Sequence, residues 1–191
     1  MTDTLSLFFA LLAAIALGIA AITAAALVAR SGPLERFRND LQPVALWLAC
    51  GIATTATLGS LYYSEIADFP PCRYCWFQRI AMYPLSLILA IAATTKDSAV
   101  RKYAAPLAGI GALLAANHLR IQWFPEEGGS CSADAPCSAQ WVDVAGFVSI
   151  PMMALCGFLA ILLLSLSAGR TTLDLTDDGG QISAPNQKAT T

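Results

Sequence analysis

The sequence predicts an all-α membrane protein, a polytopic four-helix bundle with one additional N-terminal transmembrane helix, five spans in all. Two observations favour this fold class. Of the 191 residues, 57% are hydrophobic and only 13% are charged, whereas soluble domains carry about 25% charged residues. A soluble domain of this size still exposes about a third of its unfolded surface, so its core could not hide this apolar excess. The second observation is that the uncharged residues fall into five long runs.

These five runs set the expected spans. They comprise residues 4–29, 41–64, 80–95, 103–119 and 144–169. A helix needs about 20 apolar residues to cross the hydrocarbon core, and the first, second and fifth runs reach this length alone. The third reaches it with Trp76 and Phe77 if Arg79 lies near the interface, and the fourth carries His118 at its end, before Leu119. Tryptophans near span ends are typical of an aromatic belt, and we interpret all four in this way: Trp47, Trp76, Trp123 and Trp141.

The first run raises the question of a cleaved signal peptide. Residues 1–4 contain no Lys or Arg, and the run is longer than the 7–15-residue apolar region of a signal peptide. We therefore expect residues 1–30 to form an uncleaved helix, followed by a short charged loop, Arg30–Asp40. The four-helix core is expected at residues 41–169. The polar segment 170–191 has almost nothing to bury and is expected to be a disordered tail.

The distribution of basic residues predicts the orientation. Eight of them flank the first, third and fifth spans on one side: Arg30, Arg36, Arg38, Lys96, Arg101, Lys102, Arg170 and Lys188. Only Arg73, Arg79 and Arg120 lie on the other side. The positive-inside rule therefore predicts a cytoplasmic C-terminus and an extracytoplasmic N-terminus. The loops at residues 64–75 and 120–143 then face outward. The net charge of −2 provides no basic surface for nucleic acid.

The six cysteines divide into two groups. Cys50 and Cys156 lie inside expected spans, where a free Cys acts as a small apolar residue. The other four lie in the two outward loops, as Cys72 with Cys75 and Cys131 with Cys137. The outward compartment of most bacteria is oxidising, so paired cysteines there are expected as disulfides.

The C-x-x-C spacing of Cys72 and Cys75 favours a redox centre over a structural disulfide, because a bridge across so few residues restrains little chain entropy. A thiol at a helix N-terminus has a lowered pKa and exchanges readily. Pro70 and Pro71 favour a helix that begins near Cys72. Cys75 and Arg79 then follow on one helical face, with Arg79 about one turn deeper in the membrane.

Other interpretations remain open for these residues. Four cysteines can form two structural disulfides or a zinc site, but Cys131 and Cys137 are separated by five residues, more than the usual zinc spacing. We therefore expect no metal. Arg79 is either a functional donor or an interfacial residue that extends its side chain toward water. His118 is either a polar residue at a span end or a member of a pocket shared with Arg79, whose depth it matches.

The segment Cys72–Leu85 (CRYCWFQRIAMYPL), the second Cys pair and the segment Gly146–Met152 (GFVSIPM) resemble the DsbB/BdbC disulfide-bond-formation family over Leu41–Ala168. The resemblance implies a four-helix bundle that holds a quinone, ubiquinone or menaquinone, at its outward end. It implies a thiol:quinone oxidoreductase in a bacterial plasma membrane. Its partner would be an extracytoplasmic thioredoxin-fold (DsbA-like) dithiol oxidase, which it reoxidises to support disulfide formation in exported proteins.

The resemblance also implies roles for individual residues. Cys131 would be attacked by the partner's thiolate, with Cys137 as its mate. Cys72 would exchange with this loop pair, and Cys75 would face the quinone. Arg79 would hydrogen-bond or polarise the quinone carbonyl.

Three further features concern the fit to the family. His118 matches a histidine near the quinone only loosely. The helix at Leu5–Ala29 is additional to the family's four spans, and the second Cys pair is close together, as in Gram-positive-type members.

Two other classes of protein compete with this interpretation. A vitamin K epoxide reductase-like protein is also a small helical bundle with two Cys pairs, but its loop pair precedes the C-x-x-C. A non-enzymatic scaffold or transporter subunit would carry polar residues at the centres of several spans, whereas these spans contain little beyond Thr54, Thr55 and Thr57.

Overall fold

The computed structural model describes residues 2–28, 32–125 and 135–168, and within them the predicted all-α fold is confirmed. The helices are α1 (Thr2–Val28), α2 (Pro33–Leu61), α3 (Arg73–Thr95), α4 (Arg101–Trp123) and α5 (Ile150–Ala168). A π-helical turn, Tyr62–Ile66, extends α2, and a 3₁₀ turn, Ser98–Val100, joins α3 to α4.

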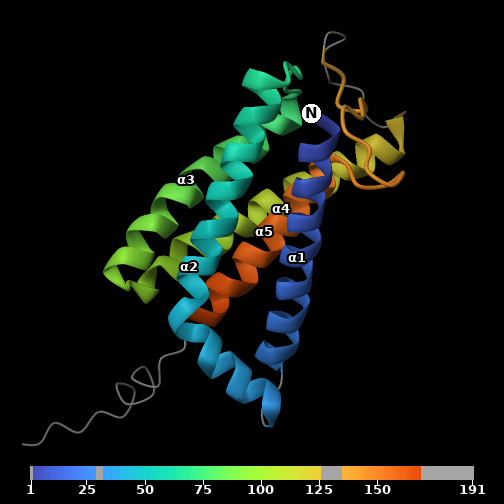
Figure 1. The fold of residues 1–191 in the computed structure, drawn as a ribbon. Helices are drawn as coiled ribbons and strands as arrows, with labels where there is room; N and C mark the ends of the chain where they lie inside the picture. Colours follow the sequence, from blue (N-terminus) through green and yellow to red (C-terminus); the bar gives the residue numbers. More distant parts are fainter. Residues whose placement is uncertain (1, 29–31, 126–134, 169–191) are drawn as a thin grey trace, which may run out of the picture.

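The helix α5 lies at the centre of the arrangement, packed against α1, α2 and α4 (Figure 1). The pairs α2–α3 and α3–α4 complete a four-helix bundle, and α1 lies outside it against α5 and α2. We call the end of the bundle that holds Cys72, Cys75 and Cys137 the cysteine end. The first turns of α1 lie at this end too, because the Tyr63 hydroxyl donates a hydrogen bond to Ser6 Oγ at 3.1 Å.

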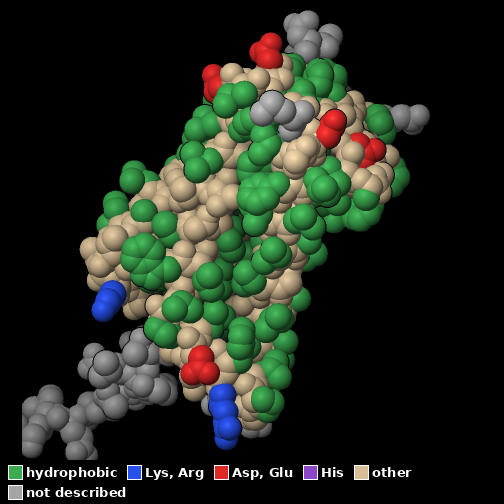
Figure 2. Space-filling model, viewed as in Figure 1, with side chains coloured by type: hydrophobic (Ala, Val, Ile, Leu, Met, Phe, Trp, Pro, Cys, Tyr) green, Lys and Arg blue, Asp and Glu red, His purple; other side chains and the backbone are tan. Residues whose placement is uncertain are grey.

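Four of the described helical stretches are long and apolar enough to cross a membrane: Thr2–Val28, Arg36–Ile66, Arg73–Thr95 and Ile150–Ala168. The charged side chains visible in Figure 2 lie toward the two ends of the molecule, with an uncharged band between them. The fifth expected span, α4, is a helix of 23 residues but is not among the four. Its last turns carry His118 and Gln122, which are only 3% and 7% exposed because they contact the protein rather than lipid.

The link between the first two helices differs from the prediction. The charged segment was expected to be a loop as far as Asp40, but α2 begins at Pro33. Proline is favourable in the first turn of a helix, and the Glu, Arg, Leu and Gln residues that follow are good helix formers. The expected tail, residues 170–191, lies outside the described residues.

Small residues allow α4 and α5 to approach closely. Ala104, Ala108 and Ala115 of α4 are fully buried, and a Cβ atom at Gly111 would overlap the ring of Phe158 on α5. Close backbone approach through small residues is the usual way in which membrane helices pack. This contact holds the middle of α4 against the middle of α5.

Candidate active site

Cys72 is the N-cap residue of α3. The chain turns sharply at Asp68, whose φ is 56°, and continues through Pro70 and Pro71 to Cys72, the residue before the first helical turn. The Cys72 Sγ accepts a hydrogen bond from the backbone N–H of Cys75 at 3.4 Å. The predicted helix start near Cys72 is therefore confirmed, and the positive end of the helix dipole favours a thiolate at this position.

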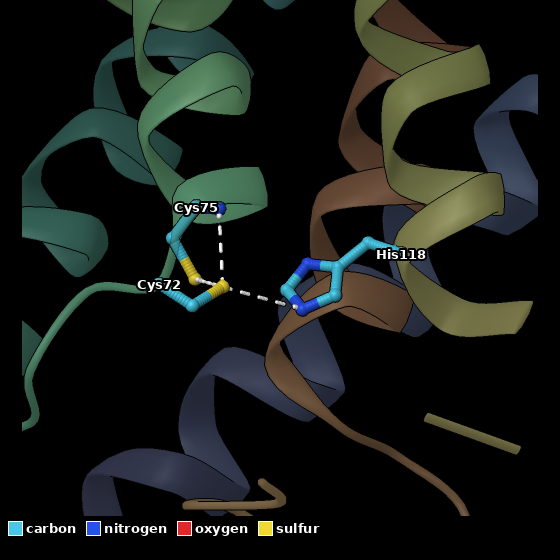
Figure 3. A group of neighbouring side chains, drawn as sticks. All are labelled: Cys72, Cys75 and His118. Carbon is cyan, nitrogen blue, oxygen red and sulfur yellow. Dashed lines mark hydrogen bonds between the residues drawn. The ribbon is translucent and has the colours of Figure 1, made fainter. Parts of the chain in front are cut away.

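The two cysteines of the C-x-x-C form a reduced, hydrogen-bonded pair. Their Sγ atoms lie 3.0 Å apart (Figure 3), and neither thiol is in a disulfide. The pKa of Cys72 is lowered to about 4, chiefly by the hydrogen bond from the Cys75 thiol; burial opposes this effect, and the hydrogen bond from His118 adds to it. Cys72 is thus a thiolate near neutral pH, although only 4% of the residue is exposed.

His118 joins this pair to the segment that follows α4. Its Nε2 atom lies 3.5 Å from Cys72 Sγ and 3.1 Å from the backbone oxygen of Cys137. A carbonyl oxygen only accepts hydrogen bonds, so Nε2 carries the proton and donates it to both partners. The other ring nitrogen, Nδ1, lies 3.1 Å from Gln78 Nε2, and Tyr74 stacks on the ring with centroids 5.6 Å apart. The imidazole is therefore held from four sides.

Cys137 lies near the C-x-x-C, since His118 Nε2 reaches both Cys72 Sγ and the Cys137 oxygen. It is 1% exposed, it belongs to a disulfide, and it packs with Cys72 in one buried cluster. Gln122 holds the adjoining backbone by donating a hydrogen bond to the oxygen of Ala139 at 3.2 Å. The fourth predicted cysteine, Cys131, lies outside the described residues.

An apolar cavity of about 370 Å³ lies beside Cys75. Its walls come from α1, α2, α3 and α5, and Cys75, Gln78 and Arg79 contribute polar atoms to it. Cys72 is not among the lining residues. Both cysteines pack with the cluster that contains Cys137, but of the two only Cys75 also lines this cavity.

Arg79 lines the same cavity as Cys75, as the helical spacing predicts. Its guanidinium is fixed on α2 by two hydrogen bonds to Ser60, from Nε to Oγ and from Nη2 to the backbone oxygen, both 2.9 Å long. The guanidinium carbon also lies 5.3 Å from the ring centroid of Trp76, a cation–π contact. The cation is thus held at the cavity wall by α2 and α3 together.

The shared pocket of His118 and Arg79 that the sequence suggested is not found in the described part of the chain. His118 does not line the cavity of Arg79; it lines a small pocket with Cys72 and Cys75. The face of α4 that carries His118 points toward the start of α3 and away from α2. Gln78, which contacts His118 and lines the cavity, was not predicted from the sequence. Its position three residues after Cys75, on the same helical face, was the available signal.

The cluster also has the donor set of a soft-metal site. Ligand atoms of Cys72, Cys75 and His118 all lie within 4.8 Å of one another, and thiolate and imidazole are zinc ligands. In the structure described, the same atoms satisfy one another by hydrogen bonds.

A dithiol at a membrane-helix N-terminus, in which the N-cap cysteine has a lowered pKa and shares a buried cluster with a further disulfide-bonded cysteine, defines a membrane thiol–disulfide oxidoreductase. Comparison with known proteins agrees with this class. The family model described as "Disulfide bond formation protein DsbB" matches residues 42–168, and the chain belongs to this family. The resemblance noted from the Cys72–Leu85 motif is confirmed, and a role in disulfide bond formation follows.

Curated relatives are similar over most of their own length. The probable disulfide formation protein C 1 of Bacillus cereus is 44% identical over 131 residues, which are 67% of this chain and 94% of the relative. The disulfide bond formation protein C of Bacillus subtilis is 45% identical over 122 residues, 63% of this chain and 88% of the relative. No solved structure gives a significant match.

Proposed function

We propose that the chain is a thiol:quinone oxidoreductase that reoxidises an extracytoplasmic thioredoxin-fold (DsbA-like) dithiol protein and passes the electrons through two Cys pairs to a membrane quinone. One observation carries this proposal. Within the C-x-x-C, Cys72 is buried in one cluster with Cys137, while Cys75, which packs against that cluster, also lines the apolar cavity. The pair thus lies between a second redox-capable cysteine and a site suited to an apolar acceptor.

The first half of the reaction is an exchange between the partner and the loop pair. One partner thiolate attacks Cys131 of a Cys131–Cys137 disulfide, and Cys137 leaves as a thiolate. The partner's second thiol then loses its proton and attacks the partner sulfur that is bonded to Cys131. The partner departs oxidised, and Cys131 and Cys137 are left reduced with the two protons and two electrons of the partner's dithiol.

The second half transfers these electrons to the C-x-x-C. The thiolate of Cys137 attacks Cys72 in the Cys72–Cys75 disulfide, and Cys75 leaves. Cys131 then resolves the new Cys137–Cys72 bond and releases Cys72 as a thiolate. The loop disulfide is restored, and the C-x-x-C now holds the electron pair. The burial of Cys72 and Cys137 in one cluster supports this order.

His118 and the helix terminus assist the departure of Cys72. A thiol with a low pKa is the better leaving group in disulfide exchange. The Nε2–H of His118, the thiol of Cys75 and the N-terminus of α3 all stabilise negative charge on Cys72 Sγ. We therefore propose that His118 acts on the cysteines, in place of the quinone contact expected from the sequence.

The cavity fits a quinone, either ubiquinone or menaquinone. Its lining is largely apolar, as an isoprenoid chain requires, and its polar residues include a redox thiol, an amide and a guanidinium beside several hydroxyl side chains. Cys75 and Arg79 would hold the ring. A bound quinone supplies a two-electron, two-proton acceptor. The protein presents the Cys75 thiol, places a cationic donor at the wall and excludes water from the thiols.

The orientation is part of the proposal. The eight-to-three distribution of basic residues supports a bacterial plasma-membrane protein with the cysteine end outward and the C-terminus in the cytoplasm. In this assignment residues 41–169 form the redox core, 1–30 the additional helix and 170–191 a cytoplasmic tail. An impermeant thiol reagent should then label Phe147→Cys in intact cells, and Ser98→Cys only after permeabilisation.

Trapping of the partner tests the proposed reaction. In this scheme the partner's own second thiol resolves the mixed disulfide. A partner whose second cysteine is replaced by serine should therefore accumulate in cells as a mixed disulfide with Cys131, and Cys131→Ser should abolish this adduct. The control is Cys156→Ser, which removes a buried thiol of α5 that has no part in the relay. Adducts at Cys72 with none at Cys131, or no adduct at all, would contradict the proposed entry point.

A further inference from the structure

The additional helix α1 lies outside the segment that the family model matches, residues 42–168, yet it forms one wall of the cavity beside Cys75. Six of its residues line this cavity: Phe9, Leu12, Ala13, Ile15, Ala16 and Ile19. The helix is firmly attached there. The buried Ser6–Tyr63 hydrogen bond holds its first turns, and Ala16 and Ala20 pack against Ala160 of α5.

Aromatic rings close the cavity at the cysteine end. Phe9 of α1 contacts Tyr63 with ring centroids 5.8 Å apart, Tyr63 stacks on Phe69 at 5.9 Å, and Phe69 stacks on Trp141 at 5.6 Å. All four rings belong to the cavity lining. This aromatic row separates the cavity from the end of the bundle, and α1 supplies its first member.

The cavity opens sideways between α1 and α2. Ile15 of α1 and Trp47 of α2 line it, yet they remain 59% and 55% exposed. Ile15 is the central residue of Thr2–Val28, and Trp47 lies well inside the apolar stretch Arg36–Ile66. The opening is therefore at the depth of the lipid hydrocarbon.

We infer that α1 is the outer wall of the quinone site and that the opening between Ile15 and Trp47 is its lateral entrance from the lipid. This inference rests on the proposed function. The polar atoms of Cys75 and Arg79 lie in the same cavity as this apolar opening, which suits a molecule with a polar ring and a hydrocarbon tail. A volume of about 370 Å³ is within the usual range for a ligand pocket, and the rest of a long tail would extend through the opening.

Two neighbouring alanines of α1 give a matched pair of variants for this inference. Ala13 lines the cavity, whereas Ala14 is exposed on the outer face of the helix. The binding of decylubiquinone or a short-chain menaquinone to the purified full chain is measured by quenching of tryptophan fluorescence. Ala13→Leu should weaken binding about tenfold or more, because added methylenes overfill a packed site. Ala14→Leu should bind within about twofold of the parent. Equal affinities in the two variants would contradict the inference.

Photochemical labelling provides a readout that does not depend on a substitution. A decylubiquinone with a photoreactive tail should label α1 peptides around Leu12–Ile15 as well as the α3 peptide that contains Cys75. Label on α3 alone would overturn the role of α1 and leave the proposed function standing. Label on neither would contradict both. A photoreactive phospholipid that labels α1 and is not displaced by decylubiquinone would show that the cavity is a lipid site, against the inference.

Discussion

The imidazole Nε2 of His118 lies 3.5 Å from the Sγ of Cys72, although the two residues are 46 positions apart in the chain. The contact links the end of α4 to the N-terminus of α3. The same nitrogen reaches the backbone oxygen of Cys137 at 3.1 Å. One side chain thus contacts a member of each Cys pair, and the predictions below begin with its effect on Cys72.

The reactivity of Cys72 should depend little on pH. Its pKa is lowered to about 4, chiefly by the hydrogen bond from Cys75, so the reactive thiolate is already formed above about pH 5. In the reduced protein, the rate of alkylation of Cys72 by iodoacetamide should be flat from pH 5 to 8. In Cys75→Ala the pKa should rise, and the rate should increase with pH over the same range. Peptide mass spectrometry identifies the modified cysteine, and a tenfold rise per pH unit in the parent would contradict the assignment.

Loss of the His118 donor should also raise the pKa of Cys72. A hydrogen bond to a charged group is worth about 1.5–3 kcal/mol, which corresponds to about one to two pKa units. His118→Ala should therefore shift the alkylation profile upward by this amount. The matched control is Asn117→Ala, which removes the bond of the neighbouring residue to the Tyr74 hydroxyl and should leave the profile unchanged. Equal shifts in both variants would indicate a general loosening of α4 instead.

The protonated ring nitrogen of His118 can be observed directly. The chain contains one histidine, so selective ¹⁵N labelling gives the signals of a single imidazole. Because the Cys137 oxygen can only accept a hydrogen bond, we expect the proton on Nε2, with Nδ1 accepting from Gln78. Gln78→Leu should change the Nδ1 shift. A spectrum with the proton on Nδ1 alone would contradict the donor role assigned to Nε2.

Removal of Arg79 should slow reoxidation of the C-x-x-C by quinone and leave the fold intact. A charged donor that stabilises a developing oxyanion is typically worth about 10²–10³ in rate, so Arg79→Ala should lose a factor of this order. Arg79→Lys should restore little, because lysine lacks the planar set of donors that reaches both Ser60 atoms. Arg73→Ala, at an exposed position of the same helix, is the control. Quinone reduction assays on purified variants test this, and unchanged turnover in Arg79→Ala would remove Arg79 from the site.

Local features of the site could be predicted from the sequence because they depend on neighbours in the chain. Pro70 and Pro71 indicated the start of α3 near Cys72, and helical spacing indicated that Cys75 and Arg79 share a face. Both follow from the geometry of one helix. The hydrophobic runs likewise indicated the helices, since span length is fixed by the bilayer.

Features that depend on packing between helices could not be predicted in this way. The contacts of His118 with Cys72, Gln78 and Cys137 join segments that are 19 to 46 positions apart. Trp47 was interpreted as part of an aromatic belt, but it lines the cavity, because only the packing of α1 beside α2 creates that space. The start of α2 was also predicted wrongly, because the charged residues before Asp40 were interpreted as a loop, whereas a helix can continue beyond the membrane.

Electron transfer from Cys72 and Cys75 to a quinone is the central claim, and a single-turnover measurement without oxygen tests it most directly. In the double variant Cys131→Ser/Cys137→Ser the C-x-x-C is the only pair of the relay that remains. After reduction and mixing with excess decylubiquinone or a menaquinone analogue, this variant should form one quinol and one Cys72–Cys75 disulfide per protein. The reciprocal variant Cys72→Ser/Cys75→Ser should form no quinol. Quinol production by the reciprocal variant, or none by the first with either quinone, would contradict the account.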